Sequence, residues 1–383
     1  MPKILHIITG LGLGGAETVL ASLLLNRHSA GFDSSVISLL DEGHFGPILS
    51  ARGIPVTCLK ISRRLPSLFS LLSLRKAIQA ASPDLVHCWM YHPALIHGLV
   101  SGFLPHKPVV WGIHHTTTEK GSVSKRTIGV IRAVQMLSKL VPSSVVCCSH
   151  STLQYHASLG FPPTRLSVIL NGVDPAVFNR NSQTRARIRT ALGLPPDAFV
   201  VGNIGRYDPQ KDQSNFVQAA ALVCARQPQM RFVMCGLGVD NDNPALAGEI
   251  KSADLGQNFQ LLGLRRDIPD ILNALDVFVL SSSYGEALPV ALLEAQSAGV
   301  IGISTDVGDS KFVIDDDSRI VPPRRPDLLA AAILRVALAP EEQRIAMAQG
   351  GVRRVAEHYS VDQMSRHYAS LYTELIGAPE GQS

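Results

Sequence analysis

The stretch DVFVLSSSYGEALPVALLEAQSAG, residues 276–299, contains the structural unit that the rest of the chain repeats. Its first residues are apolar and β-branched, which is typical of a buried strand, and SSSYGE predicts a turn. Pro289 then favours a helix that begins close to it, because the missing N–H of proline is harmless in a first helical turn. A strand, a turn and a helix in this order indicate a parallel sheet with crossover helices.

The same order recurs along the whole chain. Seven strand-like runs precede residue 171: KILHIIT, DSSVISLL, IPVTCL, DLVHCW, PVVWGI, SSVVCC and LSVIL. Six more follow it: AFVVGNI, MRFVMCG, NFQLLG, LDVFVLS, GVIGIS and RIVP. Helix-length stretches such as 16–29, 66–81 and 121–140 separate the runs, so the predicted fold is α/β with two doubly wound, Rossmann-like parallel sheets.

The loop NGVDPAVFNRNSQ (171–183) separates the two groups of strands and is rich in Asn, Asp, Gly and Pro. This composition favours a hinge at 171–180. We therefore expect an N-terminal domain over 1–172 and a C-terminal domain over 173–358. The last segment, 359–383, is expected to be helical and to pack back on the N-terminal domain.

The composition fits a globular chain that works in the cytoplasm. It has 383 residues, of which 46% are hydrophobic, enough for two cores. No run reaches the ~18 uncharged apolar residues of a membrane helix, so neither a signal peptide nor a membrane span is expected. The six cysteines form no C-x-x-C pair and most lie in apolar runs, which indicates reduced core residues.

The charge is unevenly distributed. Residues 1–170 carry 15 Lys and Arg against 6 Asp and Glu, net +9, which leaves a net −5 for the rest of the chain. Two stretches, 60–76 and 119–139, mix basic and apolar residues, as helices on an anionic bilayer do. Two solvated surface helices would show the same composition. Aromatic residues for base stacking are sparse there, so nucleic acid is not an expected partner.

A glycine-rich loop follows the first strand-like run. In GLGLGGAE, Gly10, Gly12 and Gly15 satisfy G-x-G-x-x-G before a helix expected from about Ala16. Bare amides at a helix start suit a phosphate or a sugar. A dinucleotide is the alternative, with Asp41 or Glu42 as the acidic partner of its ribose.

Two loops of the C-terminal half carry candidate donor-binding groups. In GRYDPQKD (205–212), Arg206 and Lys211 flank a proline turn beside Gly205, and two fixed cations suit a diphosphate. A surface turn with solvated cations is the alternative. In LRRD, the backbone of Leu264 and Arg265 is placed to meet a nucleobase.

The two glutamates of the opening stretch are spaced too widely for an acid/base pair. If both were helical they would lie ~12 Å apart, against the ~5 to 9.5 Å of a glycosidase pair. We interpret them as a clamp, with Glu286 accepting sugar hydroxyls and Glu294 a ribose diol. The free amides of Ala287 and Leu288, before Pro289, would face a diphosphate at the positive helix end.

Histidines follow another strand of the N-terminal half, in VVWGIHHTTT. Because side chains alternate along a strand, we expect one of His114 and His115 to face a ligand and the other to lie in the core. The histidines His87, His92 and His97 are five residues apart and do not stack on one helix face, so a metal site is not expected there. The D-x-D of DNDN (240–243) is interpreted as a solvated loop.

Taken together, the motifs resemble the retaining glycosyltransferases of family 4, which have the GT-B fold. GGAE, NGVD, GRYDPQKD, LGLRRDIPDILNALDVFVLSS, GEALPVALLEA and STDVGDS follow the family's order over almost the whole chain. The resemblance implies two Rossmann-like domains facing a central cleft, with the acceptor held by the N-terminal domain and a UDP- or GDP-sugar by the C-terminal one. No metal is expected.

The resemblance also implies roles for individual residues. It suggests His115, Arg206, Lys211 and Glu286 as catalytic residues, with His115 meeting the transferred sugar. Expected on the donor side are Gly14, Gly15, Gly205, Arg206, Lys211, Leu264, Arg265, Glu286, Ala287, Leu288, Pro289 and Glu294. Expected on the acceptor side are Gly12, Glu17, His114 and Thr116. Ala287, Val290 and the stretch DSKFV (309–313) depart from the family pattern, which leaves the donor sugar undefined.

The expected function is retaining transfer of a hexosyl group to a glycan or lipid-linked acceptor, in the synthesis of lipopolysaccharide, exopolysaccharide or glycolipid. From the basic stretches we expect a cytoplasmic protein that rests on the inner leaflet, with Arg63, Arg64, Arg75, Lys76, Lys125 and Arg126 at the membrane. Two alternatives remain: an NAD-binding or nucleotide-sugar-modifying enzyme, and a non-catalytic sugar-nucleotide binder.

Overall fold

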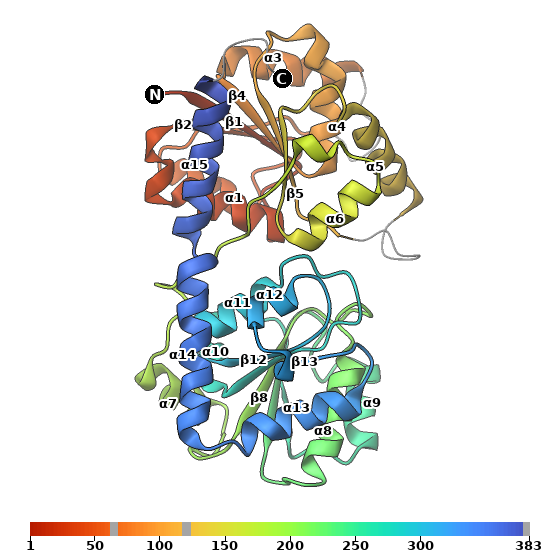
Figure 1. Ribbon diagram of the computed structural model, residues 1–383, viewed down its shortest axis with the longest axis vertical. Coiled ribbons are helices and arrows are strands. Elements are labelled where there is room, and N and C mark those ends of the chain that lie inside the picture. Colours follow the sequence, from red (N-terminus) through yellow and green to blue (C-terminus); the bar gives the residue numbers. More distant parts are fainter. Residues whose placement is uncertain (62–67, 117–123, 378–383) are drawn as a thin grey trace. The chain divides into compact units, whose positions relative to one another are not determined.

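The computed structural model describes residues 1–61, 68–116 and 124–377, and it divides into two compact units (Figure 1). The N-terminal unit comprises Met1–Gly172 and the chain from Val361, and the C-terminal unit is Val173–Ser360. The second boundary lies two residues beyond the predicted one. Each unit is a layered α/β structure whose helices cover both faces of a sheet (Figure 1).

The N-terminal sheet has seven parallel strands in the order β3-β2-β1-β4-β5-β6-β7. They are β1 (Lys3–Ile8), β2 (Asp33–Ser38), β3 (Val56–Cys58), β4 (Leu85–Trp89), β5 (Val109–Ile113), β6 (Ser144–Cys147) and β7 (Leu166–Val168). Every strand falls within one of the predicted runs. Their near-continuous apolar character is what a sheet buried on both faces requires.

The C-terminal sheet has six parallel strands in the order β10-β9-β8-β11-β12-β13. They are β8 (Val200–Ile204), β9 (Arg231–Cys235), β10 (Phe259–Leu261), β11 (Val277–Leu280), β12 (Ile301–Thr305) and β13 (Ile320–Val321). The predicted pair of doubly wound parallel sheets is thus confirmed.

Helices of the N-terminal unit connect successive strands, and α15 returns from the end of the chain. They are α1 (Gly15–Leu25), η1 (Arg27–Gly31), α2 (Phe45–Ala51), α3 (Leu68–Ala81), α4 (Tyr91–Val100), η2 (Ser101–Phe103), α5 (Lys125–Leu137), α6 (His150–Ser158), η3 (Pro163–Arg165) and α15 (Val361–Gly377). The helix expected over 16–29 ends earlier, at Leu25, and continues as the 3-10 turn η1. That over 121–140 begins at Lys125 among the described residues, where Ser124 caps its first turn.

Helices of the C-terminal unit follow the same alternation until β13, after which the chain is helical. They are α7 (Ser182–Ala191), α8 (Gln213–Cys224), α9 (Pro244–Ser252), α10 (Ile268–Ala274), α11 (Val290–Ser297), α12 (Ser310–Ile314), η4 (Asp317–Arg319), α13 (Pro326–Ala337) and α14 (Glu341–His358). Pro289 is the N-cap of α11 and precedes the helix, so its predicted place inside the first turn was wrong by one residue.

The last helix, α15, completes the core of the N-terminal unit. Tyr368 and Tyr372 on this helix are fully buried against β1 and β4. At its start, Asp362 accepts hydrogen bonds from Asn26 and Arg27, both at 2.7 Å. None of the described helices is long and apolar enough to cross a membrane.

Each sheet has a switch point, which is the place where the order of its strands reverses. The loops that follow the two strands at this point run in opposite directions and leave room for a ligand. In the N-terminal sheet this point lies between β1 and β4, and in the C-terminal sheet between β8 and β11. The loops after β8 and β11 are GRYDPQKD and SSSYGE. The fold therefore brings together two motifs that are 75 residues apart in sequence.

Candidate functional site

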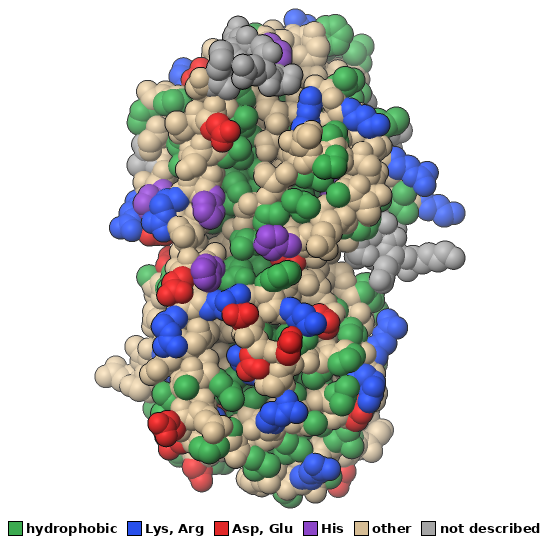
Figure 2. All heavy atoms as spheres, viewed as in Figure 1, with side chains coloured by type: hydrophobic (Ala, Val, Ile, Leu, Met, Phe, Trp, Pro, Cys, Tyr) green, Lys and Arg blue, Asp and Glu red, His purple; other side chains and the backbone are tan. Residues whose placement is uncertain are grey.

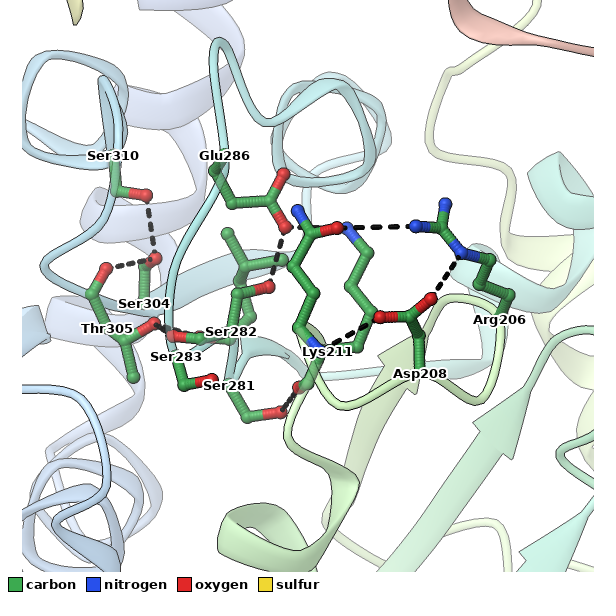
Figure 3. Close-up of polar contacts among 12 residues, drawn as sticks. Arg206, Asp208, Lys211, Ser281, Ser282, Ser283, Glu286, Ser304, Thr305 and Ser310 are labelled. Carbon is green, nitrogen blue, oxygen red and sulfur yellow. Dashed lines mark hydrogen bonds and ion pairs between the residues drawn. The ribbon is translucent and has the colours of Figure 1, made fainter. Parts of the chain in front are cut away.

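An ion pair joins the two loops at the switch point of the C-terminal unit (Figure 3). The Lys211 ammonium lies 2.6 Å from Oε1 of Glu286, and the Ser282 hydroxyl donates to the same oxygen at 2.6 Å. Both charged side chains are largely buried, 19% and 10% exposed. The sequence had assigned Lys211 to a diphosphate and Glu286 to a sugar, and the structure places these two groups in direct contact.

Arg206 lies on the same loop and is more exposed. Its guanidinium donates to Asp208 at 3.0 Å and to the Gln210 side chain at 3.2 Å (Figure 3). Partial burial tends to raise the pKa of Asp208, but the hydrogen bond from the Gln210 amide and the charge of Arg206 hold it below its usual value. Asp208 therefore keeps the Arg206 side chain against the loop. Sequence reasoning missed this carboxylate, although D-P-Q is a recognisable turn sequence.

Two glycines allow the backbone of this site to pack closely. Gly236 has φ +154°, and a Cβ there would overlap the Gly205 carbonyl next to Arg206. Gly308 has φ +55°, and a Cβ there would overlap the carbonyls of Glu286 and Ala287. The loop after β12 thus packs directly on the Glu286 loop, and the Asp309 amide donates to the Ala287 carbonyl at 2.9 Å. Both loops are held in place from behind.

Hydroxyl groups stabilise the Glu286 loop from the sheet side. The Ser281 hydroxyl donates to the Lys211 carbonyl at 2.8 Å, and Thr305 donates to the Ser282 carbonyl at 2.6 Å (Figure 3). Asn203 at the end of β8 donates to Ser281 at 3.2 Å. The SSS segment, interpreted from the sequence only as a turn, therefore fixes the two charged loops to each other.

Glu294 lies on the second turn of α11 and differs from Glu286 in having no counter-ion. Burial raises its pKa to about 7. Among the described residues no group forms a hydrogen bond or ion pair with its carboxyl group. Leu292 and Leu293 beside it are fully buried. No side chain among the described residues caps the start of α11. The amides of its first turn and the Glu294 carboxyl group are thus the polar groups that α11 offers to a ligand.

Leu264 and Arg265, also expected on the donor side, lie on the neighbouring loop after β10, and Leu288 lies on the Glu286 loop. Leu264 is 68% exposed, and Arg265 pairs with Asp267 at 2.6 Å. Leu288 is buried, with 5% exposure. The expected contact of this loop with a nucleobase stays a prediction.

In the N-terminal unit, the predicted glycine loop lies after β1. Gly14 caps α1 and the Glu17 side chain folds over it, while a Cβ at Gly12 or Gly15 would meet open space. Gly43, with φ +47°, packs against the backbone of Leu11 and Gly12. The loop is therefore shaped by a contact with the segment after β2, which the glycine motif did not predict.

The two histidines after β5 have different surroundings. The His114 ring stacks on Trp89, with centroids 5.4 Å apart, and burial lowers its pKa to about 4. His115 meets the edge of Tyr91 at 6.2 Å, and burial lowers its pKa as well. The imidazole of His114 is therefore neutral at pH 7. Thr116, next to them, is the last described residue before the gap at 117–123.

Backbone strain marks the switch point of this unit. Met90, directly after β4, has φ +71° and ψ 177°, a conformation that costs about 1–3 kcal/mol for a residue with a side chain. Its amide donates to the Gly112 carbonyl at 2.8 Å, and its sulfur accepts from the His114 amide at 3.3 Å. Met90 thereby links the loops after β4 and β5. Nothing in the sequence signalled this.

The groups considered for metal binding lie apart. His87 binds the Tyr372 hydroxyl at 2.7 Å, and His97 lines a cavity at the other end of the sheet. The side chain of Asn243, in the DNDN turn, caps α9. Among the described residues, no three His, Cys, Asp or Glu side chains are grouped to hold a metal ion.

Comparison with known proteins identifies the family. The model described as glycosyl transferases group 1 matches residues 184–353, and that of glycosyltransferase family 4 matches residues 13–177. The chain is a member of glycosyltransferase family 4. The structure agrees: the Anabaena protein Alr3699/HepE, solved with UDP, superimposes over 97% of this chain and 100% of its own, with a TM-score of 0.84 and 22% identity. This likeness shows the GT-B fold.

Two relatives of this family-4 chain illustrate its range. A UDP-Gal:alpha-D-GlcNAc-diphosphoundecaprenol alpha-1,3-galactosyltransferase of Escherichia coli is 28% identical over 69% of this chain and 68% of its own length. The lipopolysaccharide core biosynthesis mannosyltransferase LpsB of Rhizobium meliloti is 28% identical over 61% of this chain and 66% of its own. The family-4 chain is accordingly a glycosyltransferase related to enzymes of lipid-linked and lipopolysaccharide glycans.

Proposed function

We propose that the protein transfers a hexosyl group, with retention, from a UDP-sugar to a glycan or lipid-linked acceptor. The observation that carries the proposal is the pairing of Lys211 with Glu286 beside Arg206 at the switch point of the C-terminal unit. We favour UDP over GDP because the galactosyltransferase relative is named for UDP-Gal and the HepE structure was solved with UDP. A non-catalytic binder needs no such preorganised pair.

The proposal gives each charged group a role. Arg206 and Lys211 neutralise the diphosphate, so no metal is needed for that task, and the uncapped start of α11 adds positive potential. Glu286 is held by Lys211 and Ser282 and orients the sugar hydroxyls. Glu294 accepts the ribose diol, and Leu264 and Arg265 border the base. His115 is proposed to meet the transferred sugar.

Retention is proposed to proceed by attack on the face from which the leaving group departs. The bond between the anomeric carbon and the diphosphate oxygen breaks, and the acceptor oxygen bonds to that carbon. The acceptor's proton passes to the departing phosphate oxygen. Fixed cations lower the barrier because the negative charge of the leaving group grows in the transition state.

We propose that the cytoplasmic leaflet of a membrane presents the acceptor to the protein. The acceptor named for the Escherichia coli relative is a diphosphoundecaprenol. In this chain, residues 43–173 hold thirteen Lys and Arg but only Asp84 and Glu119 as acidic residues. An anionic surface would attract that region of the N-terminal unit.

Some of the cations proposed to face the membrane are exposed and others are not. Lys76, Lys125 and Arg126 are exposed, and Figure 2 shows Lys and Arg side chains projecting where Figure 1 draws α5. Arg75 is different: its guanidinium lies 6.0 Å from the centroid of the Phe103 ring, and its Nε is buried. Arg63 and Arg64 lie outside the described residues.

A panel of UDP-, GDP- and ADP-sugars tests the donor by thermal stabilisation, since a ligand that binds only the folded state raises the melting temperature. We expect UDP-sugars to stabilise the protein most, in the presence or absence of a chelator. Stabilisation by NAD alone would overturn the proposal in favour of the dinucleotide alternative.

Sedimentation with vesicles tests the membrane contact separately. We expect binding to anionic vesicles at low salt, release at high salt, and no binding to neutral vesicles. Protein that stays in the supernatant with anionic vesicles at low salt would indicate a soluble acceptor, whatever the donor panel shows.

A further inference from the structure

A cavity of about 480 Å³ lies in the N-terminal unit, away from the switch point. It is bordered by Val86 and Val109, which lie at the beginnings of β4 and β5, so it opens at the amino edge of the sheet. Its other walls are the C-terminal ends of α3, α4 and α5. The volume lies within the roughly 300–1,000 Å³ of small-molecule sites.

Small residues keep the cavity open. At Gly98 on α4, a Cβ would lie 2.9 Å from Leu137 on α5, so the two helices pack closely at that point. Further along, at Gly102 in η2, a Cβ would meet nothing within 4 Å. Both glycines line the cavity, together with Ile78 and Val141. The walls are therefore largely apolar, and the space beyond Gly102 is unfilled.

One polar group in the wall has no partner. His97 is 2% exposed, and its Nδ1 forms no hydrogen bond within the described part of the chain. Burial lowers its pKa to about 4, so the imidazole is neutral at pH 7. His97 therefore adds no charge to the wall at pH 7, which favours an apolar occupant.

The mouth of the cavity is both apolar and cationic. Leu140 lines it and is 80% exposed, and Phe103, next to the lining residue Gly102, is 68% exposed. Lys107 lines it as well and is exposed. Among the described residues that line the cavity none is acidic. An apolar rim with a cation matches the boundary between the acyl chains and the phosphates of an anionic bilayer.

We propose that this cavity binds one alkyl chain of an anionic phospholipid. The chain lies among the apolar walls, and the phosphate contacts Lys107. Phe103 and Leu140 enter the membrane interface on either side. The site would hold the N-terminal unit at the surface where a lipid-linked acceptor is presented, and it does not depend on which donor the C-terminal unit binds.

Lauroyl lysophosphatidylglycerol, used below its micellar concentration, is the probe, and titration calorimetry the measurement. We expect saturable binding of one molecule per chain. Gly102→Trp places a large side chain in the open space and should weaken binding at least tenfold. Gly129→Trp is the matched control, because its Cβ also meets open space, on α5 away from the cavity. Lys107→Gln should weaken binding of this probe but leave that of neutral monolauroylglycerol unchanged.

Non-saturable uptake, or equal binding by Gly102→Trp and Gly129→Trp, would overturn the inference. If Gly102→Trp does not fold, the test is the change in selectivity of Lys107→Gln. Equal weakening of the binding of both probes by Lys107→Gln would also contradict the inference. Stabilisation by a UDP-sugar, measured on the same variants, should be unchanged. The glycosyltransferase assignment therefore stands or falls independently.

Discussion

The two units have the same layered construction but bury polar groups in different ways. In the N-terminal unit the buried polar groups include neutral rings: His87 stacks on Trp89 with centroids 4.4 Å apart and bonds to Tyr372. Twelve of the thirteen histidines belong to this unit. In the C-terminal unit they include ion pairs, such as Arg189 with Asp276 at 2.8 Å.

This difference separates the tasks of the two switch points. A neutral ring can contact a sugar, but it cannot balance the charge of a diphosphate. The C-terminal unit has two cations at its switch point, each already held by a carboxylate, so little reorganisation is needed when an anion develops there. The N-terminal unit instead carries its cations on the surface.

We expect the largest difference between the two units to be in their stability at low pH. Burial depresses the pKa of His6, His97, His114 and His156 to about 3 or 4 in the folded state, against 6.5 unfolded. The unfolded chain therefore binds more protons in this window, and stability falls as the pH drops from about 6.5 to about 4. For fully buried His97 alone the loss is about 3 kcal/mol, at about 1.4 kcal/mol per pKa unit.

Tryptophan fluorescence measures this effect in one unit only, because Trp89 and Trp111, the two tryptophans of the chain, both lie in the N-terminal unit. We expect its emission to shift to the red between pH 6 and 4, before the C-terminal unit unfolds. Hydrogen exchange can follow β8 and β11 in parallel. Unfolding of both units at the same pH would contradict the expected difference in their stability.

Two arginines on α7 test the importance of buried pairs in the C-terminal unit. Arg189 is buried and bonds to Asp276 and to three backbone carbonyls. We expect Arg189→Ala to destabilise the protein by about 3–5 kcal/mol, because three carbonyls lose their donor and Asp276 loses one of its two counter-ions, Arg185 being the other. Arg187→Ala, which breaks an exposed pair with Asp270, should cost less than about 1 kcal/mol. Similar urea midpoints for both variants would refute the distinction.

Lys211→Ala and Arg206→Ala should lower the transfer rate by ~10² or more without unfolding the chain. Each removes one of the two cations that we propose to face the leaving diphosphate. Lys251→Ala, which removes an exposed lysine on α9 of the same unit, is the control. Steady-state kinetics of sugar transfer is the measurement. Near-normal rates in both site variants would show that Arg206 and Lys211 are surface cations without a role in transfer.

Glu294→Ala should weaken donor binding by about 1.5–3 kcal/mol, the usual contribution of a hydrogen bond to a charged group. Since burial raises the pKa of Glu294 to about 7, we also expect wild-type affinity to rise with pH around 7, as the carboxylate forms. Calorimetric titration with UDP between pH 6 and 8 measures both effects. If the variant is folded and its affinity for UDP is unchanged, Glu294 does not bind the donor.

Much of the fold follows from local sequence. Apolar, β-branched runs located all thirteen strands, because strands buried on both faces differ in composition from the turns that separate them. The loops containing Arg206 and Glu286 could be singled out as candidates because each follows a strand-like run and contains a motif of the family that the chain resembles.

Long-range contacts were beyond such reasoning. The bond between Lys211 and Glu286, the packing of Gly308 on the Glu286 loop and the strained backbone of Met90 all depend on how distant loops meet. The cavity beside His97 depends on three helix ends. No local pattern reports on these features, since each residue alone has an ordinary sequence context.

Hydrogen exchange with and without a UDP-sugar tests the central claim most directly, because it shows where the donor binds. The account predicts protection in peptides that contain residues 205–212 and 282–294, at the carboxyl ends of β8 and β11. Protection confined to residues 10–17, the glycine loop of the N-terminal unit, with no change after β8 and β11, would contradict it and favour the dinucleotide alternative.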